Sequence, residues 1–334
     1  KTMSWLNPWS KAVKADQSRD AEEGDASLSI PDDTLGLHTL YEPKNGKIEL
    51  EIPSIVAVHG LGGDSFSTWT DKSSGCLWLR DLLPDTKPLK EARIMTWGYD
   101  ARAFVRPFEK STTGRTFTFA EALLFDLFNA RTSEESKSRP LIFVGHSLGG
   151  NVIKSALVGA NNQQGLYGDI LKSTRCLVFF GTPHQGADAA VWGTYLGNLA
   201  KGLGIRNAEV TRELQRWSNP LVELRVSFAQ LAPRFLIRTF FETKKKYNVL
   251  VWTLLPPKAV GLDNADHLQI CKFRDAANSN AKRVLQTFGA VSNMIKAQAE
   301  SVGVVQYMPS LSERSDGNPK RLSPLEERLA SLRN

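Results

Sequence analysis

One apolar strand that runs directly into a glycine-flanked serine constrains this chain more than any other feature. The run Leu141–Val144 is followed at once by Gly145-His146-Ser147-Leu148-Gly149-Gly150, and a helical pattern begins near Asn151. This is Gly-x-Ser-x-Gly between a strand and a helix. Glycines beside the serine let the strand and helix approach without Cβ clashes, and the tight turn lifts the hydroxyl above the sheet. The pattern therefore predicts Ser147 as a nucleophile.

Short apolar runs alternate with helical patterns through the middle of the chain, which is typical of a mainly parallel sheet. Several runs are apolar on both faces, as expected of strands covered by helices on both sides. We expect about seven or eight strands, at Gly36–Tyr41, Ile55–Val58, Arg93–Trp97, Leu141–Val144, Cys176–Phe180, Phe235–Phe241 and Val249–Leu255 among others. Helices are expected over Phe119–Phe128, Asn151–Leu157 and Ala281–Ile295.

A second glycine cluster follows another apolar strand. His59-Gly60-Leu61-Gly62-Gly63 comes directly after Ile55–Val58. Such a loop can turn backbone N–H groups toward a carbonyl oxygen that becomes negative during acyl transfer. We expect the N–H groups of Leu61 and Leu148 to form this oxyanion hole. The alternative is a phosphate-binding glycine loop, but no Gly-Lys-Ser/Thr ending follows.

A serine hydroxyl needs a base, and the chain offers five histidines. Three of them precede Ser147, where packing or loop-shaping roles are expected. His184 follows the strand after the serine, too early for the final member of a triad. His267 comes after the last expected strand and just before the terminal helix, which matches the order nucleophile, acid, histidine. The histidines are His38, His59, His146, His184 and His267.

The acid should lie at the carboxyl end of a strand between the serine and His267. Glu242 ends the run Phe235–Phe241 and is the best-placed carboxylate. Asp188, after the preceding strand, is the alternative acid. Asp263 and Asp266 are expected only to shape the histidine loop. The acid would fix the histidine tautomer and stabilise the imidazolium.

The ends of the chain differ in composition from its middle. Residues 1–34 are expected to form a tail or linker, and residues 301–334 a low-complexity tail or linker. Between them, residues 35–300 are expected to form one domain, since its size permits a single core. Residues 188–233 carry helix-like patterns that fit either a small helical cap over the site or ordinary helices packed on the sheet.

Five segments together carry a family resemblance: His59–Gly63 with Trp69, Thr96–Tyr99, Gly145–Gly150, Phe180–His184 with Gly186, and Asp266–Lys272. As a set, over about residues 35–295, they resemble the serine esterases of the lipase-like α/β-hydrolases. More narrowly, the chain is similar to the serine-active-site-containing proteins and their fungal relatives. The resemblance implies an α/β-hydrolase fold and lipid-linked ester chemistry. It places the family's serine, late histidine and Phe-x-Glu-Thr acid on Ser147, His267 and Glu242.

The distribution of charge and the spacing of the cysteines argue against several classes of function. The formal charge is +7, but the basic residues are spread along the chain rather than clustered, which argues against a nucleic-acid partner. The three cysteines lack the spacing of a zinc site or a disulfide framework. No apolar run approaches the roughly 18 residues of a membrane span. We expect no cofactor and no metal, and an intracellular, cytoplasmic protein, with contact to a mitochondrial or endoplasmic-reticulum membrane surface as the alternative.

These patterns predict an intracellular serine esterase that cleaves a lipid or other acyl ester through Ser147, His267 and Glu242 and an acyl-enzyme. Two alternatives stay open. One is a hydrolase-like signalling or recognition module of a multidomain protein, for which a complete set of triad residues is not required. The other is a lipid acyltransferase, in which an acceptor other than water takes the acyl group.

Overall fold

One mainly parallel sheet organises the computed structural model, which describes residues 34–43, 52–101, 115–184, 189–202, 218–244 and 259–306. Its seven strands lie in the order β1-β3-β2-β4-β5-β6-β7. Only the β1–β3 pair is antiparallel, and the other five pairs are parallel. The strands are β1 (Gly36–Tyr41), β2 (Ser54–Val58), β3 (Arg93–Gly98), β4 (Leu141–His146), β5 (Thr174–Phe180), β6 (Leu236–Glu242) and β7 (Ala259–Leu262).

The central strands are buried on both faces, as their uninterrupted apolar sequences predict. Every residue of β2 and β4 is buried. Alternation along β2 sends Val56 and Val58 into one apolar core, while Ile55 and Ala57 enter a second core across the sheet. A strand with both faces in a core needs helices on both sides.

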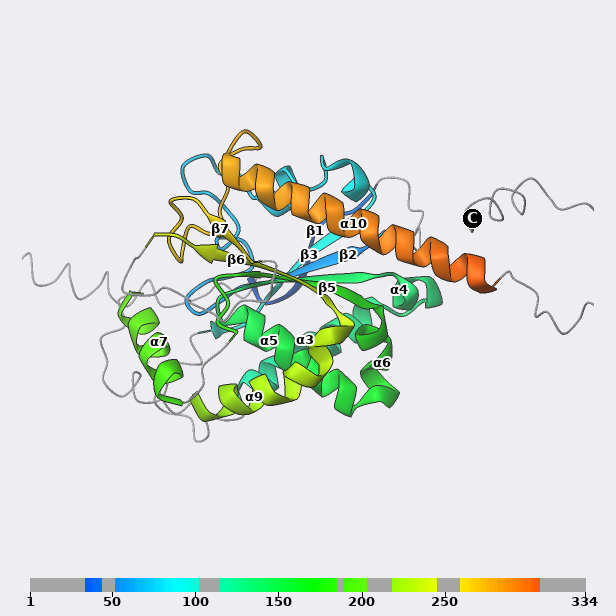
Figure 1. Ribbon diagram of the computed structural model, residues 1–334, viewed down its shortest axis with the longest axis horizontal. Coiled ribbons are helices and arrows are strands. Elements are labelled where there is room, and N and C mark those ends of the chain that lie inside the picture. Colours follow the sequence, from blue (N-terminus) through cyan, green and yellow to red (C-terminus); the bar gives the residue numbers. More distant parts are fainter. Residues whose placement is uncertain are drawn as a thin grey trace, which may run out of the picture. The chain divides into compact units, whose positions relative to one another are not determined.

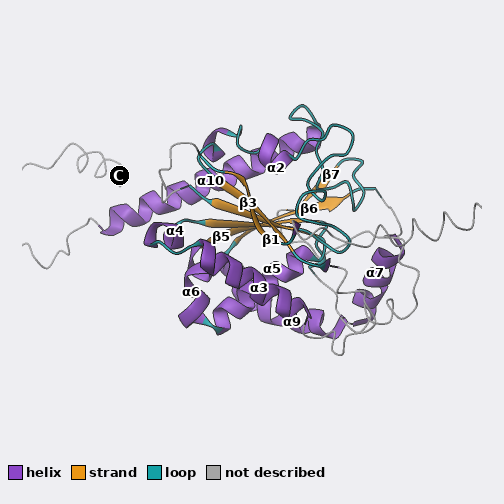
Figure 2. Ribbon diagram, turned by 180° about the vertical axis from the view of Figure 1, so that it is seen from behind, coloured by secondary structure: helices purple, strands orange, loops and turns teal. Residues whose placement is uncertain are grey.

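Helices supply these two covers (Figures 1 and 2). The first core contains apolar side chains of α3, α5, α6 and α9, and the second contains those of α2 and of α10 up to Ile295. This arrangement is the α/β-hydrolase fold and confirms the fold class expected from the sequence. The helices are α2 (Trp78–Asp81), α3 (Arg115–Ala130), α4 (Glu134–Ser138), α5 (Gly149–Asn162), α6 (Gln164–Ser173), α7 (Ala189–Gly202), α9 (Ser218–Leu231) and α10 (Ser279–Gln306), with short 3₁₀ turns at Lys87–Leu89 and Ala232–Arg234.

Two compact units divide the chain, one over residues 1–295 and one over residues 296–334. In the second unit, residues 296–306 are described, and they are helical. Within the described parts of the chain, no helix has both the length and the apolar character needed to cross a membrane.

The expected and observed elements differ mainly at the end of the sheet. The strand expected over Val249–Leu255 lies outside the described residues. The sheet instead includes β7, a four-residue strand that the sequence did not predict. A run this short, with Gly261 inside it, has too little alternation to be recognised as a strand. Helix α6 was also missed, and α10 is longer than expected.

Part of the segment considered as a cap packs as ordinary helix. In α9, Leu221, Phe228 and Leu231 are buried in the same core as α3 and α5. At the end of α7, Leu199 and Ala200 enter this core as well. The α9 part of residues 188–233 is therefore packed against the sheet's own helices.

Candidate active site

Ser147 lies in a strained turn between β4 and α5. The strand ends at His146 and the helix begins at Gly149, so only two residues connect them. Ser147 has a φ of 51°, in the left-handed region that non-glycine residues rarely adopt. Holding a residue there costs about 1–3 kcal/mol, which the surrounding structure must offset. One hydrogen bond that offsets this cost runs from the Ser147 N–H to the Phe180 carbonyl at the end of β5, over 2.9 Å.

Glycines around the turn permit very close backbone contacts. A Cβ added to Gly149 would lie 2.2 Å from the His59 carbonyl oxygen and 2.3 Å from that of Val58. A Cβ on Gly145 would lie 2.6 Å from the Gly150 Cα. The start of α5 is therefore pressed against the end of β2, which no residue with a side chain would allow.

His267 connects Ser147 to Glu242. Its Nε2 lies 2.9 Å from Ser147 Oγ, and its Nδ1 lies 2.9 Å from Glu242 Oε1. A carboxylate only accepts, so Nδ1 donates to Glu242 and Nε2 accepts from the serine hydroxyl. All three residues are at least nine-tenths buried, with 1–2% of their surface exposed. The structure thus brings together the three residues that the sequence singled out.

The histidine loop is tied directly to the strand that carries Glu242. Thr243 Oγ1 donates to the Leu262 carbonyl over 2.8 Å, and the Asn264 N–H donates to Thr243 Oγ1 over 3.0 Å. The Lys244 N–H donates to the Ala265 carbonyl over 3.0 Å. These bonds fix the distance between the carboxylate and the imidazole.

The two carboxylates of the histidine loop, Asp263 and Asp266, take part in other contacts. Asp266 Oδ1 accepts from the N–H groups of Leu268 and Gln269, so it shapes the histidine loop. Asp263 pairs with Arg283 at 2.8 Å on the surface. Asp188 lies outside the described residues.

The loop after β2 runs against the serine. A Cβ on Gly60 would lie 2.7 Å from the Ser147 Cβ. Leu61 and Leu148 are both buried in the core shared with α5. Within the described part of the chain, neither of their N–H groups donates to another protein atom. These are the two N–H groups that the sequence predicts as oxyanion donors, and that role stays a prediction.

His59 and Tyr99 hold this loop. Tyr99 donates its N–H to His59 Nε2 over 3.2 Å and its hydroxyl to the His59 carbonyl over 3.0 Å, and the two rings stack 4.4 Å apart. Because Nε2 accepts, Nδ1 carries the proton and donates to the Gly60 carbonyl over 2.9 Å. Burial lowers the pKa of His59 to about 4, so the ring is neutral at pH 7. The sequence suggested only a general loop-shaping role here.

His146 supports the histidine loop from the other side. Its Nε2 donates to the backbone carbonyl of His267 over 2.9 Å, and the two rings lie 5.2 Å apart. Burial, as the largest cause, lowers the pKa of His146 to about 3. Adjacency to Ser147 was the signal in the sequence, but it did not reveal this contact. His184, which chain order excluded as the base, lies next to Phe179 and Thr239 instead.

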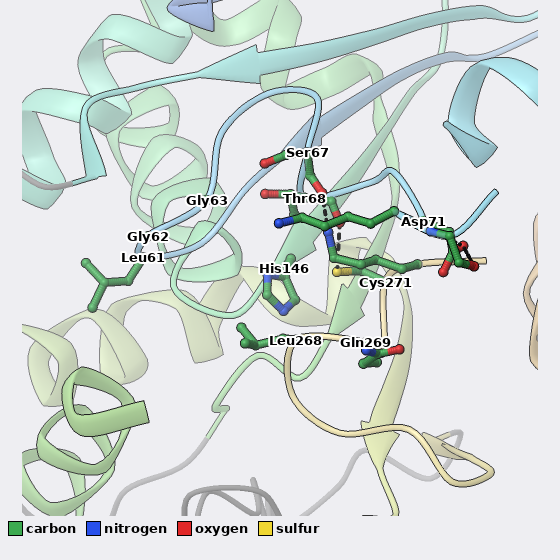
Figure 3. Close-up of a pocket in the computed structure, with 13 residues that line it drawn as sticks. Leu61, Gly62, Gly63, Ser67, Thr68, Asp71, His146, Leu268, Gln269 and Cys271 are labelled. Carbon is green, nitrogen blue, oxygen red and sulfur yellow. Dashed lines mark hydrogen bonds between the residues drawn. The ribbon is translucent and has the colours of Figure 1, made fainter. Parts of the chain in front are cut away.

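A cavity of about 520 Å³ lies beside these residues. Figure 3 shows His146 between the Leu61–Gly63 loop and the segment that contains Leu268 and Gln269. The wall of the cavity includes the polar side chains of Ser67, Thr68, Asp71, Lys72, Gln269 and Lys272. Lys272 Nζ is held by the backbone carbonyls of Ser67 and Thr70. The cavity therefore offers hydrogen-bonding groups next to the serine turn.

No metal-binding cluster of three or more His, Cys, Asp or Glu side chains is found among the residues that the structure describes. Acyl transfer by a serine, a histidine and a carboxylate needs no metal.

Comparison with known proteins gives distant relatives. No family model matches the chain. SERAC1 of Bos taurus is 25% identical over 319 residues, covering 84% of this chain and 46% of that protein. SERAC1 of Danio rerio is 28% identical over 262 residues, covering 70% of this chain and 38% of that protein. The chain is thus a distant homologue of SERAC1 over most of its length, as the motifs suggested, and it spans less than half of those relatives.

Solved structures with a similar backbone arrangement include the Bacillus licheniformis lipase BlEst2, at 18% identity and a TM-score of 0.45. The match covers 77% of this chain and 97% of that one. Another is an esterase B from Lactobacillus rhamnosis with a tributyrin phosphonate inhibitor, at 14% identity and a TM-score of 0.43. The match covers 89% of this chain and 99% of that one.

The contact at Gly149 generates a stability prediction. We expect Gly149→Ala to lower the free energy of unfolding by about 2 kcal/mol or more, because the new methyl group meets two backbone oxygens. Gly165→Ala in α6 is the matched control, since a Cβ there meets no atom within 4 Å. That change should leave stability unchanged or raise it by up to about 1 kcal/mol. Urea unfolding of both variants measures the difference, and equal effects would contradict the tight approach.

The buried histidines generate a pH prediction. Burial lowers the pKa values of His59 to about 4 and His146 to about 3, and that of His184 well below its usual value. Below about pH 6.5 the unfolded chain therefore binds protons that the folded chain does not. We expect the free energy of unfolding to be greatest above pH 6.5 and to fall as the pH drops toward 4, by up to about 1.4 kcal/mol per pH unit for each histidine.

Urea unfolding at several pH values between 7 and 5 measures this slope. His59→Gln should reduce the slope, since one titrating group is lost. A parent protein whose stability stays constant or increases over this range would show that the rings are not held neutral.

Proposed function

We propose that the chain is a serine carboxylic-ester hydrolase that cleaves an acyl ester through a covalent acyl-enzyme. The observation that carries this proposal is the continuous hydrogen-bonded line from Glu242 through His267 to Ser147, with both contacts at 2.9 Å. A serine with an aligned base and a base oriented by a carboxylate is the arrangement that activates a hydroxyl for attack.

In the first half-reaction, Ser147 Oγ attacks the ester carbonyl while His267 Nε2 takes the hydroxyl proton. The carbonyl oxygen becomes negative and accepts from the N–H groups of Leu61 and Leu148. His267 then gives its proton to the departing alcohol, and the serine remains acylated. Glu242 stabilises the imidazolium that forms between these two proton transfers.

In the second half-reaction, His267 takes a proton from water, and the resulting hydroxide equivalent attacks the acyl carbonyl. The tetrahedral species collapses, the carboxylic acid leaves, and Ser147 Oγ recovers its proton from His267. The side chains of all three residues are buried, so these charges develop in a medium that strengthens their mutual interaction.

The cavity in Figure 3 supports a substrate with a polar part. It contains one acidic and two basic side chains, Asp71, Lys72 and Lys272, together with hydroxyl and amide groups. A ligand group that both donates and accepts hydrogen bonds could displace water from such a cavity with little loss of binding free energy. We therefore place the polar portion of the ester there, and lipid esters with a hydrated head group are the substrates to test first.

Covalent labelling tests the nucleophile. We expect a fluorophosphonate to modify Ser147 alone, because this serine has an aligned base and two available oxyanion donors. Ser147→Ala should abolish labelling and lower ester turnover by about 10⁴-fold or more. Ser155→Ala, a buried serine in the same helix α5, is the matched control and should label normally. Persistent labelling of the Ser147→Ala protein, mapped by mass spectrometry, would refute the assignment.

Glu242→Gln tests the acid. The amide keeps the shape of the side chain but leaves the imidazolium without a negative partner, so we expect kcat to fall by about 10²- to 10⁴-fold while the protein stays folded. Asp263→Asn is the control, because this carboxylate pairs with Arg283 at the surface of the same loop. Asp188→Asn should have the smaller effect. A larger loss at Asp188 than at Glu242 would move the acid to the segment after β5.

A further inference from the structure

Three arginines surround a small cavity at the amino ends of the parallel strands, the edge of the sheet opposite Ser147. Arg93 is the first residue of β3, Arg131 follows α3, and Arg139 precedes β4. The cavity that they line has a volume of about 40 Å³. Since one water molecule needs roughly 10–15 Å³ by this measure, the space holds about three waters or one small oxyanion.

The backbone fixes two of these side chains. Arg131 Nη2 donates to the carbonyls of Lys137 and Arg139, both over 2.8 Å, and to Ser173 Oγ over 3.1 Å. Arg139 donates from Nε to the Ile52 carbonyl over 2.9 Å and from Nη2 to the Glu91 carbonyl over 2.7 Å. The guanidinium groups are therefore held in place before any ligand arrives, so binding does not have to order them.

Donors remain unused at the cavity. Arg131 Nε is buried and has no hydrogen-bond partner in the described structure. Arg93 Nε lies 2.9 Å from Glu42 Oε2, but its N–H does not point at that oxygen, so the pair is ionic without a hydrogen bond. A buried donor without an acceptor costs free energy, which an oxygen in the cavity would recover.

The positive charge of these arginines is only partly compensated. Burial, followed by the charges of Arg139 and Arg93, lowers the pKa of Arg131 to about 10. Two described carboxylates act on these arginines, Glu42 and Asp169, and both residues are exposed. Glu42 also lines the cavity and pairs with Arg93 at 2.9 Å. Three guanidinium side chains against this one half-exposed carboxylate leave an excess of positive charge around the space.

We propose that this cavity binds a phosphate-class oxyanion, either free inorganic phosphate or the terminal phosphate of a small monoester. Guanidinium groups bind such oxyanions through charge-assisted, paired N–H contacts. The anion would connect the start of β3, the end of α3 and the start of β4, and it would do so far from the ester chemistry. The proposal does not depend on the proposed hydrolase function.

Titration of the full chain with inorganic phosphate, at constant ionic strength balanced by chloride, tests this site. We expect one saturable binding event by calorimetry and a melting temperature that rises with phosphate concentration. Arg93→Gln should weaken binding by about 10- to 100-fold, since one charge-assisted contact is lost. This side chain is partly exposed, and its Nε makes no hydrogen bond within the described residues, so the variant should fold. Arg131→Lys, which keeps the charge but loses Nε, should weaken binding as well.

Lys137→Gln is the control, because its amine pairs with Glu134 at the surface and does not line the cavity. Phenyl phosphate distinguishes the two possible ligands. Equal affinity of the protein for phenyl phosphate and inorganic phosphate indicates a site for the terminal phosphate of a monoester. Binding of inorganic phosphate alone indicates a site for the free ion. Absence of saturable binding in the parent, or equal weakening by Arg93→Gln and Lys137→Gln, would overturn the proposal.

Discussion

The close approach of helix α5 to the end of strand β2 is the constraint on which the site depends. Gly149 lies against the carbonyls of Val58 and His59, in a space where no Cβ fits. This contact forces the chain between β4 and α5 into two residues, and Ser147 takes the left-handed conformation as a result. It also brings the glycine loop after β2 alongside the serine. The nucleophile and its expected oxyanion donors are therefore products of one packing contact.

Parallel strands bring distant parts of the chain to the same edge. Ser147 follows β4, Glu242 ends β6, and His267 comes after β7, so three segments separated by up to 120 residues meet where their strands end. Glu242 and His267 do not rely on the sheet alone, because Thr243 and Lys244 bond to the loop that carries the histidine. Farther along this loop, the Trp78 indole donates to the Cys271 carbonyl over 3.0 Å. The loop is thus held at both ends, which keeps its imidazole in line.

The sequence predicted those parts of the site that depend on chain order and on glycine spacing. A strand followed by Gly-x-Ser-x-Gly, a late histidine and a carboxylate at a strand end identify Ser147, His267 and Glu242, and the structure places them in contact. The direction of a ring is not encoded in such patterns, so the bond from His146 to the His267 carbonyl was not foreseen. Strand β7 was missed for a different reason, because four residues are stabilised by pairing with β6 rather than by their own periodicity.

The neutrality of the neighbouring histidines matters to the proposed chemistry. When His267 becomes an imidazolium, any positive charge in the buried space around it would raise the energy of that state. The His146 ring lies 5.2 Å from that of His267, and His59 belongs to the glycine loop beside Ser147. Burial lowers both pKa values far below 7. Each ring also donates its single N–H proton to a loop carbonyl: His146 donates to the His267 carbonyl, and His59 donates to the Gly60 carbonyl. Burial therefore makes these two histidines rigid supports without charge, and the imidazolium at His267 would be stabilised by the carboxylate of Glu242, which lies 2.9 Å from its Nδ1.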